Sequence, residues 1–228
     1  MANILPFYLV CDESYSMQGA PIDAMNAALP DLHREIGTNP LVCDKTRFSI
    51  VTFSDDASVL QPLSDLSQVT QLPELQVSGG TSYASVFRLL RSEIESDIAQ
   101  LKSQGHRVFR PSVFFLSDGF PTDRADEWQG ALSQLVDKNW KPHPNILAFG
   151  IGEADPAIIG RVGVTMAFMV NGGMSPAQAL TEFATVLTRS IINSGSGAGD
   201  ALTPVMPVEV PGFTAIPNGY AALPAEEM

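Results

Sequence analysis

Five oxygen-bearing side chains, in three separate stretches of the chain, have the types that bind a hard divalent cation. The first stretch has the pattern Asp-x-Ser-x-Ser at Asp12, Ser14 and Ser16, where alternation is expected to place both serine side chains on one side of an extended turn. The second supplies Thr81 after two glycines, and the third supplies Asp118. Mg²⁺ prefers an octahedron of six oxygen ligands at about 2.1 Å. We therefore predict that these five residues form one metal site.

The charges of this residue set indicate what the metal would do. Two carboxylates, Asp12 and Asp118, balance one divalent ion, and the hydroxyl ligands are neutral. If the carboxylates act partly by orienting bound water, the ion stays electrophilic and keeps an open position. A Glu or Asp of a partner protein can fill that position with a strong ionic bond in a partly desolvated site. Mg²⁺ is the expected ion, with Mn²⁺ and Ca²⁺ as alternatives, and the expected activity is binding rather than catalysis.

Near-continuous apolar runs predict strands that are buried on both faces. The expected strands are residues 5–11, 47–53, 57–61, 113–116, 145–151 and 165–170, with 57–61 as an edge or hairpin partner. Amphipathic stripes between them predict helices at 22–32, 86–101, 128–136, after Pro156, and at 176–192. Pro30 is expected to kink the first helix or to end it early. This alternation predicts an α/β fold: a Rossmann-like, doubly wound, mostly parallel sheet with helices on both faces.

The predicted strands explain how distant residues could meet. In open α/β sheets, ligands bind beyond the carboxyl ends of the strands. Asp12 follows the first apolar run, and Asp118 follows the run that ends at Leu116. Gly79 and Gly80 allow close approach of the backbone in a loop that opens the second long helix.

The composition changes near residue 193. We predict one domain over residues 1–193 and a Gly-, Pro- and Ala-rich tail over 194–228 that is extended or disordered. Residues 193–199 have the composition of a flexible linker. The tail carries Glu226 and Glu227 near its end, and either carboxylate could enter the metal site of the same or a neighbouring molecule.

Charge and hydropathy exclude several classes of partner. The formal net charge is −12, which argues against binding to nucleic acid or to an anionic membrane surface. No apolar stretch approaches the roughly 20 residues that cross a bilayer, and the first ten residues lack the features of a signal peptide. Two cysteines, Cys11 and Cys43, do not make a disulfide framework. The cytoplasm is the expected location.

The ligand pattern resembles the metal-ion-dependent adhesion site of von Willebrand factor A and integrin I domains, in type and order. Within that superfamily, residues 21–26, 79–81 and 116–123 are similar to bacterial tellurium-resistance TerY-like proteins. The resemblance covers roughly residues 1–193. It implies a Rossmann-like fold, protein binding, and a protein kinase and a metal-dependent phosphatase as candidate partners in a phosphorylation module. Glu13 and Tyr15 depart from the small or neutral residues common in the family, which bears on metal preference and access.

Several residues have a structural interpretation beside the functional one. Asp123 could orient a metal-bound water, but its place before a helix favours a cap. Glu13 is either a charge that tunes the site or a solvated loop residue. Tyr15 and Phe120 are candidate aromatic anchors at an interface. The tryptophans are expected to pack helices against the sheet, and His33, His106 and His143 to lie at the surface without ligand spacing.

The main alternative function is Mg²⁺-dependent phosphoryl transfer with Asp12 as an aspartyl nucleophile. A phosphatase of the haloacid dehalogenase type would need a second Asp at position 14, where this chain has Ser14. The first metal loop has no Lys or Arg to hold a phosphate, and no P-loop sequence is present. These features favour the binding function.

Overall fold

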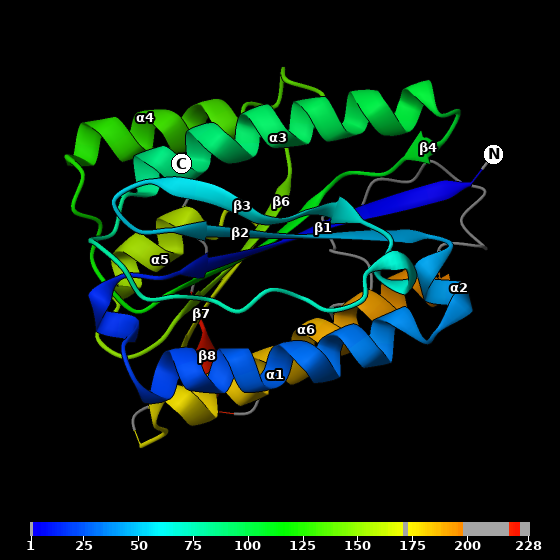
Figure 1. The fold of residues 1–228 in the computed structure, drawn as a ribbon. Coiled ribbons are helices and arrows are strands. Elements are labelled where there is room, and N and C mark those ends of the chain that lie inside the picture. Colours follow the sequence, from blue (N-terminus) through cyan, green and yellow to red (C-terminus); the bar gives the residue numbers. More distant parts are fainter. Residues whose placement is uncertain (1, 171–172, 198–218, 224–228) are drawn as a thin grey trace.

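A central β-sheet with helices on both faces organises the chain, which we describe from a computed structural model (Figure 1). The structure describes residues 2–170, 173–197 and 219–223. The strands are β1 (Asn3–Asp12), β2 (Thr46–Phe53), β3 (Ala57–Ser64), β4 (Arg107–Val108), β5 (Ser112–Ser117), β6 (Asn145–Gly150), β7 (Met166–Val170) and β8 (Tyr220–Ala222). Their order is β3-β2-β1-β5-β6-β7-β8, and β4 pairs with β1. The interior pairs are parallel, whereas β3 and β8 are antiparallel to their neighbours.

Strand β1 shows why the sheet is covered on both faces. Phe7 and Leu9 lie in one hydrophobic core, and Tyr8 and Val10 lie in the other. Side chains alternate across a strand, so a strand that is apolar at every position must be buried on both sides. Burying one such side chain stabilises the fold by about 1.5–3 kcal/mol. The predicted α/β class with a mostly parallel sheet is confirmed.

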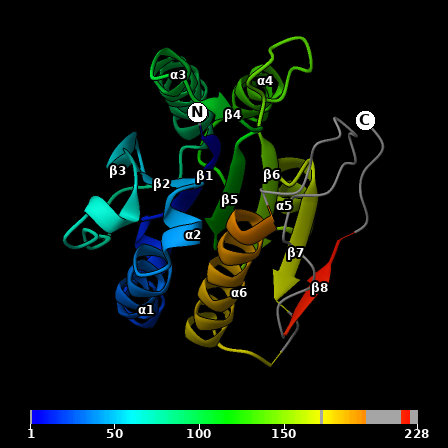
Figure 2. The same ribbon diagram turned by 90° about the vertical axis from the view of Figure 1, so that its right-hand side faces the viewer.

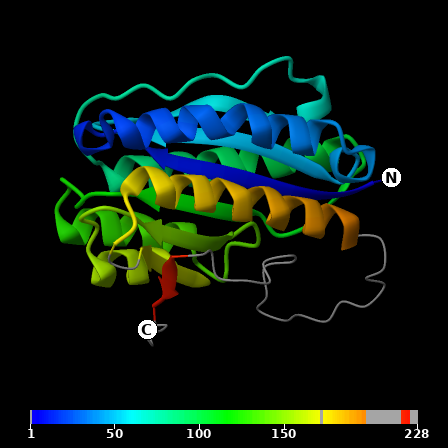
Figure 3. The ribbon, with the colours of Figure 1, turned by 90° about the horizontal axis from the view of Figure 1, so that it is seen from below.

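The helices form one layer on each face of the sheet. They are α1 (Ala20–Gly37), α2 (Pro40–Cys43), α3 (Tyr83–Ser103), α4 (Ala125–Leu135), α5 (Pro156–Val162) and α6 (Pro176–Gly197), with 3-10 turns η1 (Tyr15–Met17) and η2 (Leu66–Gln68). Helices α3 and α4 cover one face and α1 and α6 the other (Figure 2). Seen from below, α1 and α6 run side by side (Figure 3). Within the described residues, no helix is both long and apolar enough to cross a membrane.

Helix α1 continues through Pro30, so of the two expected effects of this proline, a kink or an early end of the helix, the early end is wrong. Proline removes one backbone hydrogen bond in a helix interior. Here Pro30 lies on the exposed side of α1, while Met25, Leu29 and Leu32 are buried against the sheet. Burial of residues before and after the proline holds both halves of the helix in place.

The carboxyl-terminal region differs from the predicted linker and tail. Helix α6 continues to Gly197, so residues 193–197 are helical rather than a flexible linker, and Ile191 is fully buried in its last turns. Beyond it, β8 pairs with β7 at the edge of the sheet. Tyr220 is buried there, and its hydroxyl donates to the Ala179 carbonyl at 3.1 Å. The rest of the predicted tail, including Glu226 and Glu227, lies outside the described residues.

The chain changes direction across the sheet between β1 and β5. From β1 it proceeds to β2 and β3 on one side, and it later returns to β5 on the other side of β1. Ligands in open α/β sheets bind at such a switch point, outside the carboxyl ends of the strands. Asp12 ends β1, and Asp118 directly follows β5. The topology therefore places the two predicted acidic ligands on adjacent strands.

Candidate metal centre

Four of the five predicted ligands form a connected network of short polar contacts. The hydroxyl of Ser16 donates to Asp118 Oδ1 at 2.7 Å, and the hydroxyls of Ser14 and Ser16 lie 2.9 Å apart. The backbone N–H of Ser14 donates to Asp12 Oδ1 at 2.9 Å. Residues that are more than a hundred positions apart in the sequence thus meet at one point.

Thr81 reaches the same point from the glycine-rich loop. A Cβ atom built on Gly119 would lie 3.5 Å from Ser16 Oγ and 3.7 Å from Thr81 Oγ1, so both hydroxyls lie close to Gly119. The Thr81 carbonyl accepts a hydrogen bond from the Thr122 N–H at 2.8 Å, which ties this loop to the one after β5. The structure brings all five predicted residues together. Their role as metal ligands stays a prediction.

A 3-10 turn, rather than the extended turn that we expected, positions the two serines. Ser14 is the residue before η1 and has an extended backbone, whereas Ser16 lies inside η1. Met17 is fully buried and anchors the turn in the core. The expectation of an extended turn is wrong, but the two hydroxyls still face each other because the tight turn brings Ser16 back beside Ser14.

Ser117 is a member of the site that the sequence reasoning missed. Its hydroxyl donates to Asp12 Oδ2 at 2.6 Å. Cys11 of β1 pairs with Leu116 of β5, so the next residue along each strand, Asp12 and Ser117, is also adjacent. With Ser14 on the other oxygen, Ser117 fixes the orientation of the Asp12 carboxylate. A polar residue that ends a buried apolar run was the available signal.

Asp55, in the turn between β2 and β3, holds the glycine-rich loop and was also missed. Its Oδ1 accepts from the Gly80 N–H at 2.9 Å. Gly79 has a positive φ of 59°, and a Cβ atom there would lie 2.5 Å from Asp55 Oδ2. The Gly79 carbonyl accepts from the Tyr15 N–H at 3.2 Å, which joins the glycine loop to the first metal loop. The close approach requires glycine at position 79.

Asp123 caps a helix, but a different one from the helix that it precedes. Its Oδ2 accepts from the Ala84 N–H at 2.8 Å, and its Oδ1 accepts from the Ser82 hydroxyl at 2.9 Å. Both donors lie at the start of α3, whereas α4 has no side-chain cap. The predicted cap of α4 is therefore wrong. Asp123 instead stabilises the first turn of α3, directly after Thr81.

Glu13 lies between the first metal loop and the chain segment that precedes the glycine loop. Its Oε1 accepts from the Gln76 N–H at 2.7 Å, and its backbone carbonyl accepts from the Ser78 N–H at 2.7 Å. Partial burial raises the pKa of its carboxyl. Glu13 is therefore a positioning residue, not a freely solvated loop charge.

The electrostatics of the site fit a cation. The side chains of Asp12 and Asp118 are buried, at 0% and 7% exposure. Burial raises the pKa of Asp12 to about 6, against hydrogen bonds from Ser117 and Ser14 that lower it, and burial also raises the pKa of Asp118. Across the part of the chain that the structure describes, neither carboxylate forms an ion pair with a basic side chain. Buried charges without a partner are costly, and a divalent ion would remove that cost.

The donor types also indicate which ion fits. Apart from Asp12 and Asp118, the predicted ligands are hydroxyls, and the described residues contain no group of three or more His, Cys, Asp or Glu that could hold a metal. Oxygen donors without His or Cys are typical of sites for Mg²⁺, Mn²⁺ or Ca²⁺. His33, His106 and His143 lie in separate segments of the chain and are half-buried, so the expectation that they lie at the surface holds only in part.

Of the two tryptophans expected to pack a helix against the sheet, Trp128 does so, because it lies on α4 and is buried in the core. Trp140 differs from that expectation: it lies outside the helices and is half-buried, with the Arg91 guanidinium 4.4 Å from its ring centroid. Tyr15 and Phe120, beside the metal loops, are exposed at 69% and 57%. They are therefore available to a partner.

The α/β sheet, with the predicted ligand residues gathered at its switch point, can now be compared with known families. The family model described as "von Willebrand factor type A domain" matches residues 7–120, which is half of the chain. This stretch contains all five predicted ligands. The chain belongs to the von Willebrand factor type A domain family.

Solved structures of the same fold come from several sources. A von Willebrand factor type A protein from Catenulispora acidiphila is 15% identical, with a TM-score of 0.56 over 84% of this chain and 43% of that one. Proximal thread matrix protein 1 from the mussel byssus, in a form with a zinc-occupied MIDAS motif, is 15% identical, with a TM-score of 0.57 over 84% and 48%. The pilus adhesin SpaC from Lactobacillus rhamnosus GG is 14% identical, with a TM-score of 0.61 over 85% and 30%.

At 14–15% identity, these similarities show a shared fold. The chain spans less than half the length of each of these three proteins. Comparison with curated proteins gives no match.

Proposed function

We propose that this chain is a metal-dependent protein-binding module, in which Mg²⁺ held at the end of β1 and β5 takes a carboxylate from a partner protein. The observation that carries the proposal is the pair of buried carboxylates, Asp12 and Asp118, that have no basic partner among the described residues. Ser16, which donates to Asp118, is exposed. A cation bound there would be accessible from solvent on one side.

Each residue has a distinct part in this proposal. Asp12 and Asp118 supply the negative charge, and Ser117 holds Asp12 in place. The hydroxyls of Ser14, Ser16 and Thr81 supply neutral oxygen donors, so the ion's charge is not overcompensated. When bound, the ion supplies a positive centre for an external carboxylate. The zinc-occupied MIDAS motif of the mussel protein supports the idea that this fold holds a metal at such a motif.

We propose binding rather than catalysis because no group among the described residues of the site is arranged as a nucleophile or a base. Both oxygens of Asp12 already accept hydrogen bonds, from Ser14 and Ser117. Arg124 is the single basic residue in the segments 13–19, 54–56, 78–82, 118–124 and 151–155, and it pairs with Asp126. A phosphoryl-transfer enzyme needs cationic groups on the transferred phosphate. Release of phosphate that is lost in Asp12→Asn would contradict this proposal.

A protein kinase and a metal-dependent phosphatase are our candidate partners. Their support is the similarity of residues 21–26, 79–81 and 116–123 to TerY-like proteins. Direct binding of either purified candidate in Mg²⁺, with loss of binding in Asp118→Ala, would support the assignment. Equal binding with and without chelator would exclude it.

The test of the proposed function uses the metal first and the partner second. Titration calorimetry with MgCl₂ should give binding to the wild-type chain and none to Asp118→Ala, with far-UV circular dichroism unchanged. Asp31→Ala is the matched control, because this exposed carboxylate lies on α1 and pairs with Arg34. Partner capture should then require Mg²⁺ and be lost with Asp118→Ala. Capture that persists in chelator would contradict the proposal.

A further inference from the structure

Two exposed aromatic residues lie in the loops that carry the candidate metal centre. Tyr15 precedes Ser16, and Phe120 follows Gly119. A Cβ atom on Gly119 would contact Ser16 Oγ at 3.5 Å, so the residues next to Tyr15 and Phe120 touch. Large aromatic residues are enriched among those that dominate binding energy at protein interfaces. Aromatic surface in the loops of the candidate metal centre is therefore exposed.

The loops at this end of the sheet carry acidic residues beyond the two predicted ligands. They occur in the turn after β1, the β2–β3 turn and the β6–α5 loop: Glu13, Asp55, Asp56, Glu153 and Asp155. The one basic residue in the described loops at this end, Arg124, already pairs with Asp126. One divalent ion would balance Asp12 and Asp118 and leave these other charges in place.

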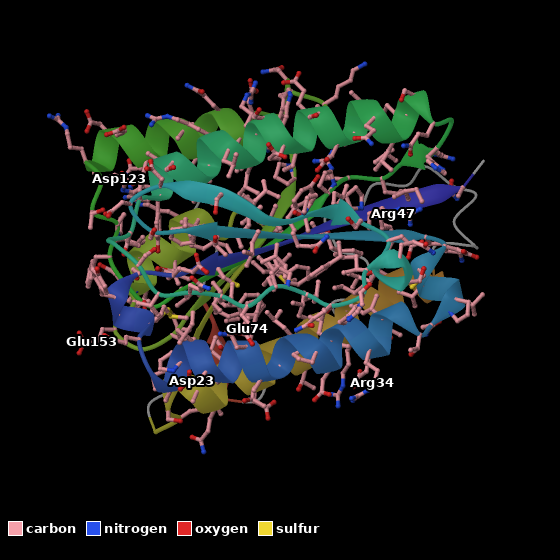
Figure 4. All side chains as sticks on the ribbon, in the orientation of Figure 1. Asp23, Arg34, Arg47, Glu74, Asp123 and Glu153 are labelled. Carbon is pink, nitrogen blue, oxygen red and sulfur yellow. The ribbon has the colours of Figure 1, made fainter. Side chains whose placement is uncertain are left out.

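The contacts of two loops place free carboxylates next to the site. The β6–α5 loop lies against Asp118, since a Cβ atom on Gly152 would be 3.6 Å from Asp118 Cβ. Glu153 is the next residue, and Figure 4 shows it at this end of the molecule. Asp56 follows Asp55, which holds Gly80 of the glycine loop. Neither Glu153 nor Asp56 has a side-chain hydrogen bond or ion pair to any described residue, and both are exposed.

These charges act on whatever approaches the metal. Neighbouring residues lie within roughly one Debye length of the site at physiological salt, about 8 Å, so their field is only partly screened. A ligand with several acidic residues would be attracted by the ion but repelled by Glu153 and Asp56. In a ligand that has one carboxylate and basic side chains beside it, the ion would attract the carboxylate, and Glu153 and Asp56 would attract the basic side chains.

Resting on the function proposed above, we propose that the partner segment carries one Asp or Glu flanked by Lys or Arg, with an apolar residue that packs on Tyr15 and Phe120. The carboxylate binds the metal, the basic side chains face Glu153 and Asp56, and the apolar residue covers the aromatic surface. A polyacidic segment and a nucleic acid both lack the basic flank and are poor ligands of this surface.

Three labelled peptides test the flank directly, by fluorescence anisotropy in MgCl₂. The first has one Asp between lysines and beside a leucine, the second has glutamates in place of the lysines, and the third has Asn in place of the Asp. The first should bind at least about tenfold more tightly than the second, a difference of about 1.4 kcal/mol. The third should not bind, and the preference should shrink as salt is raised.

Charge reversal on the protein provides the reciprocal test. Asp56→Lys with Glu153→Lys should weaken the lysine-flanked peptide and strengthen the glutamate-flanked one, with Mg²⁺ affinity still measurable by calorimetry. Glu95→Lys is the matched control, because this exposed carboxylate is the thirteenth residue of α3, about 18 Å along the helix from its first residue. Tyr15→Ser with Phe120→Ser should weaken both peptides, whereas Leu41→Ser, exposed at 65% outside these loops, should weaken neither.

The outcomes separate this inference from the function on which it rests. Equal Mg²⁺-dependent binding of the lysine- and glutamate-flanked peptides would overturn the inference and leave the metal-dependent module intact. Absence of peptide binding by a chain that still binds Mg²⁺ would also overturn the inference. Absence of Mg²⁺ binding itself would overturn the proposed function.

Discussion

The two ends of the sheet use polar side chains in different ways. At the end where β2 begins, side chains donate to backbone carbonyls of their own region: Thr46 Oγ1 to Val42 at 2.9 Å, and Arg47 Nη1 to Cys43 at 2.8 Å. At the end where β1 and β5 finish, the short bonds join side chains from different loops, as Ser16 and Asp118 do. The hydrogen bonds at the first end stabilise the local backbone. At the end where β1 and β5 finish, the hydrogen bonds bring side-chain oxygens from different loops to one point.

The two ends of the sheet also differ in the charges of their loops. The segments 38–45, 104–111 and 136–144, at the end away from the candidate metal centre, contain five basic residues, Lys45, Arg107, Arg110, Lys138 and Lys141, and two acidic ones, Asp44 and Asp137. Figure 4 shows Arg47 towards this end and Glu153 at the other. The comparison teaches that the negative charge of the chain is not spread evenly. The segments 13–19, 54–56, 78–82, 118–124 and 151–155, beside the candidate metal centre, contain seven acidic residues and one basic residue. A buried carboxylate there costs stability unless a cation is present.

A substitution in the hydrophobic core between the two ends should lower the free energy of unfolding more than any other change predicted here. It should not change how Mg²⁺ stabilises the protein. Phe115 of β5 is fully buried, with ring centroids of Phe53 and Tyr83 at 5.2 and 5.0 Å. Phe115→Ala should lower the free energy of unfolding by about 3–5 kcal/mol because it leaves a cavity. Urea denaturation should show the same additional stabilisation by Mg²⁺ as in the wild type. Loss of that increment would mean that the core, not the end of the sheet, governs metal binding.

Two glycines with positive φ, one at each end of α3, sharpen the comparison. Gly79 has φ 59° and is in contact with Asp55, whereas Gly105 has φ 83° and no atom lies within 4 Å of the position that its Cβ would occupy. Gly105→Ala should cost about 1–2 kcal/mol from left-handed strain alone, with Mg²⁺ affinity unchanged. Gly79→Ala should cost at least as much and should also weaken Mg²⁺ binding in calorimetry, because the loop must move away from Asp55. Equal Mg²⁺ affinity in both variants would show that the conformation of the glycine loop does not affect metal binding.

Deleting one buried hydroxyl at each end should give the smallest change in stability. Thr46→Val removes the bond to the Val42 carbonyl and should cost about 1 kcal/mol, with no change in the response to Mg²⁺. Thr81→Val should alter the metal-free stability by a similar amount or less, but should lower Mg²⁺ affinity about tenfold or more. Calorimetry and denaturation of the two variants provide the measurement. Weaker Mg²⁺ binding in Thr46→Val and unchanged Mg²⁺ binding in Thr81→Val would contradict the placement of the metal site at the end where β1 and β5 finish.

Features that depend on local pattern were predictable from the sequence. The continuous apolar runs of β1 and β5 predict central strands, because the central strands of a parallel sheet are buried on both faces. Asp12 and Asp118 follow those runs directly, so their meeting at one edge follows from the fold class. Tyr15 and Phe120 were candidate interface anchors because they lie in the same loops, and both are exposed.

Features that depend on register or on distant contacts were not predictable. Ser117 reaches Asp12 only because of the pairing of β1 with β5, which no local pattern of residues specifies. Asp123 caps α3 rather than α4 because the two loops lie side by side in space. Strand β8 is too short for an alternating pattern, and its pairing with β7 follows from burial of Tyr220.

The central claim, that the buried carboxylates await a cation, is tested most directly by thermal unfolding of the wild type and Asp118→Asn, each in chelator and in MgCl₂. Burial raises the pKa of Asp118 in the folded state, so its ionised form opposes folding at neutral pH. Asn retains an oxygen that accepts from the Ser16 hydroxyl and removes the charge.

Without metal, Asp118→Asn should therefore be at least as stable as the wild type. Mg²⁺ at a hundred times its dissociation constant should stabilise the wild type by about 2.7 kcal/mol and leave Asp118→Asn unchanged. Equal Mg²⁺ stabilisation of both proteins, or a metal-free wild type that is more stable than Asp118→Asn, would contradict the account.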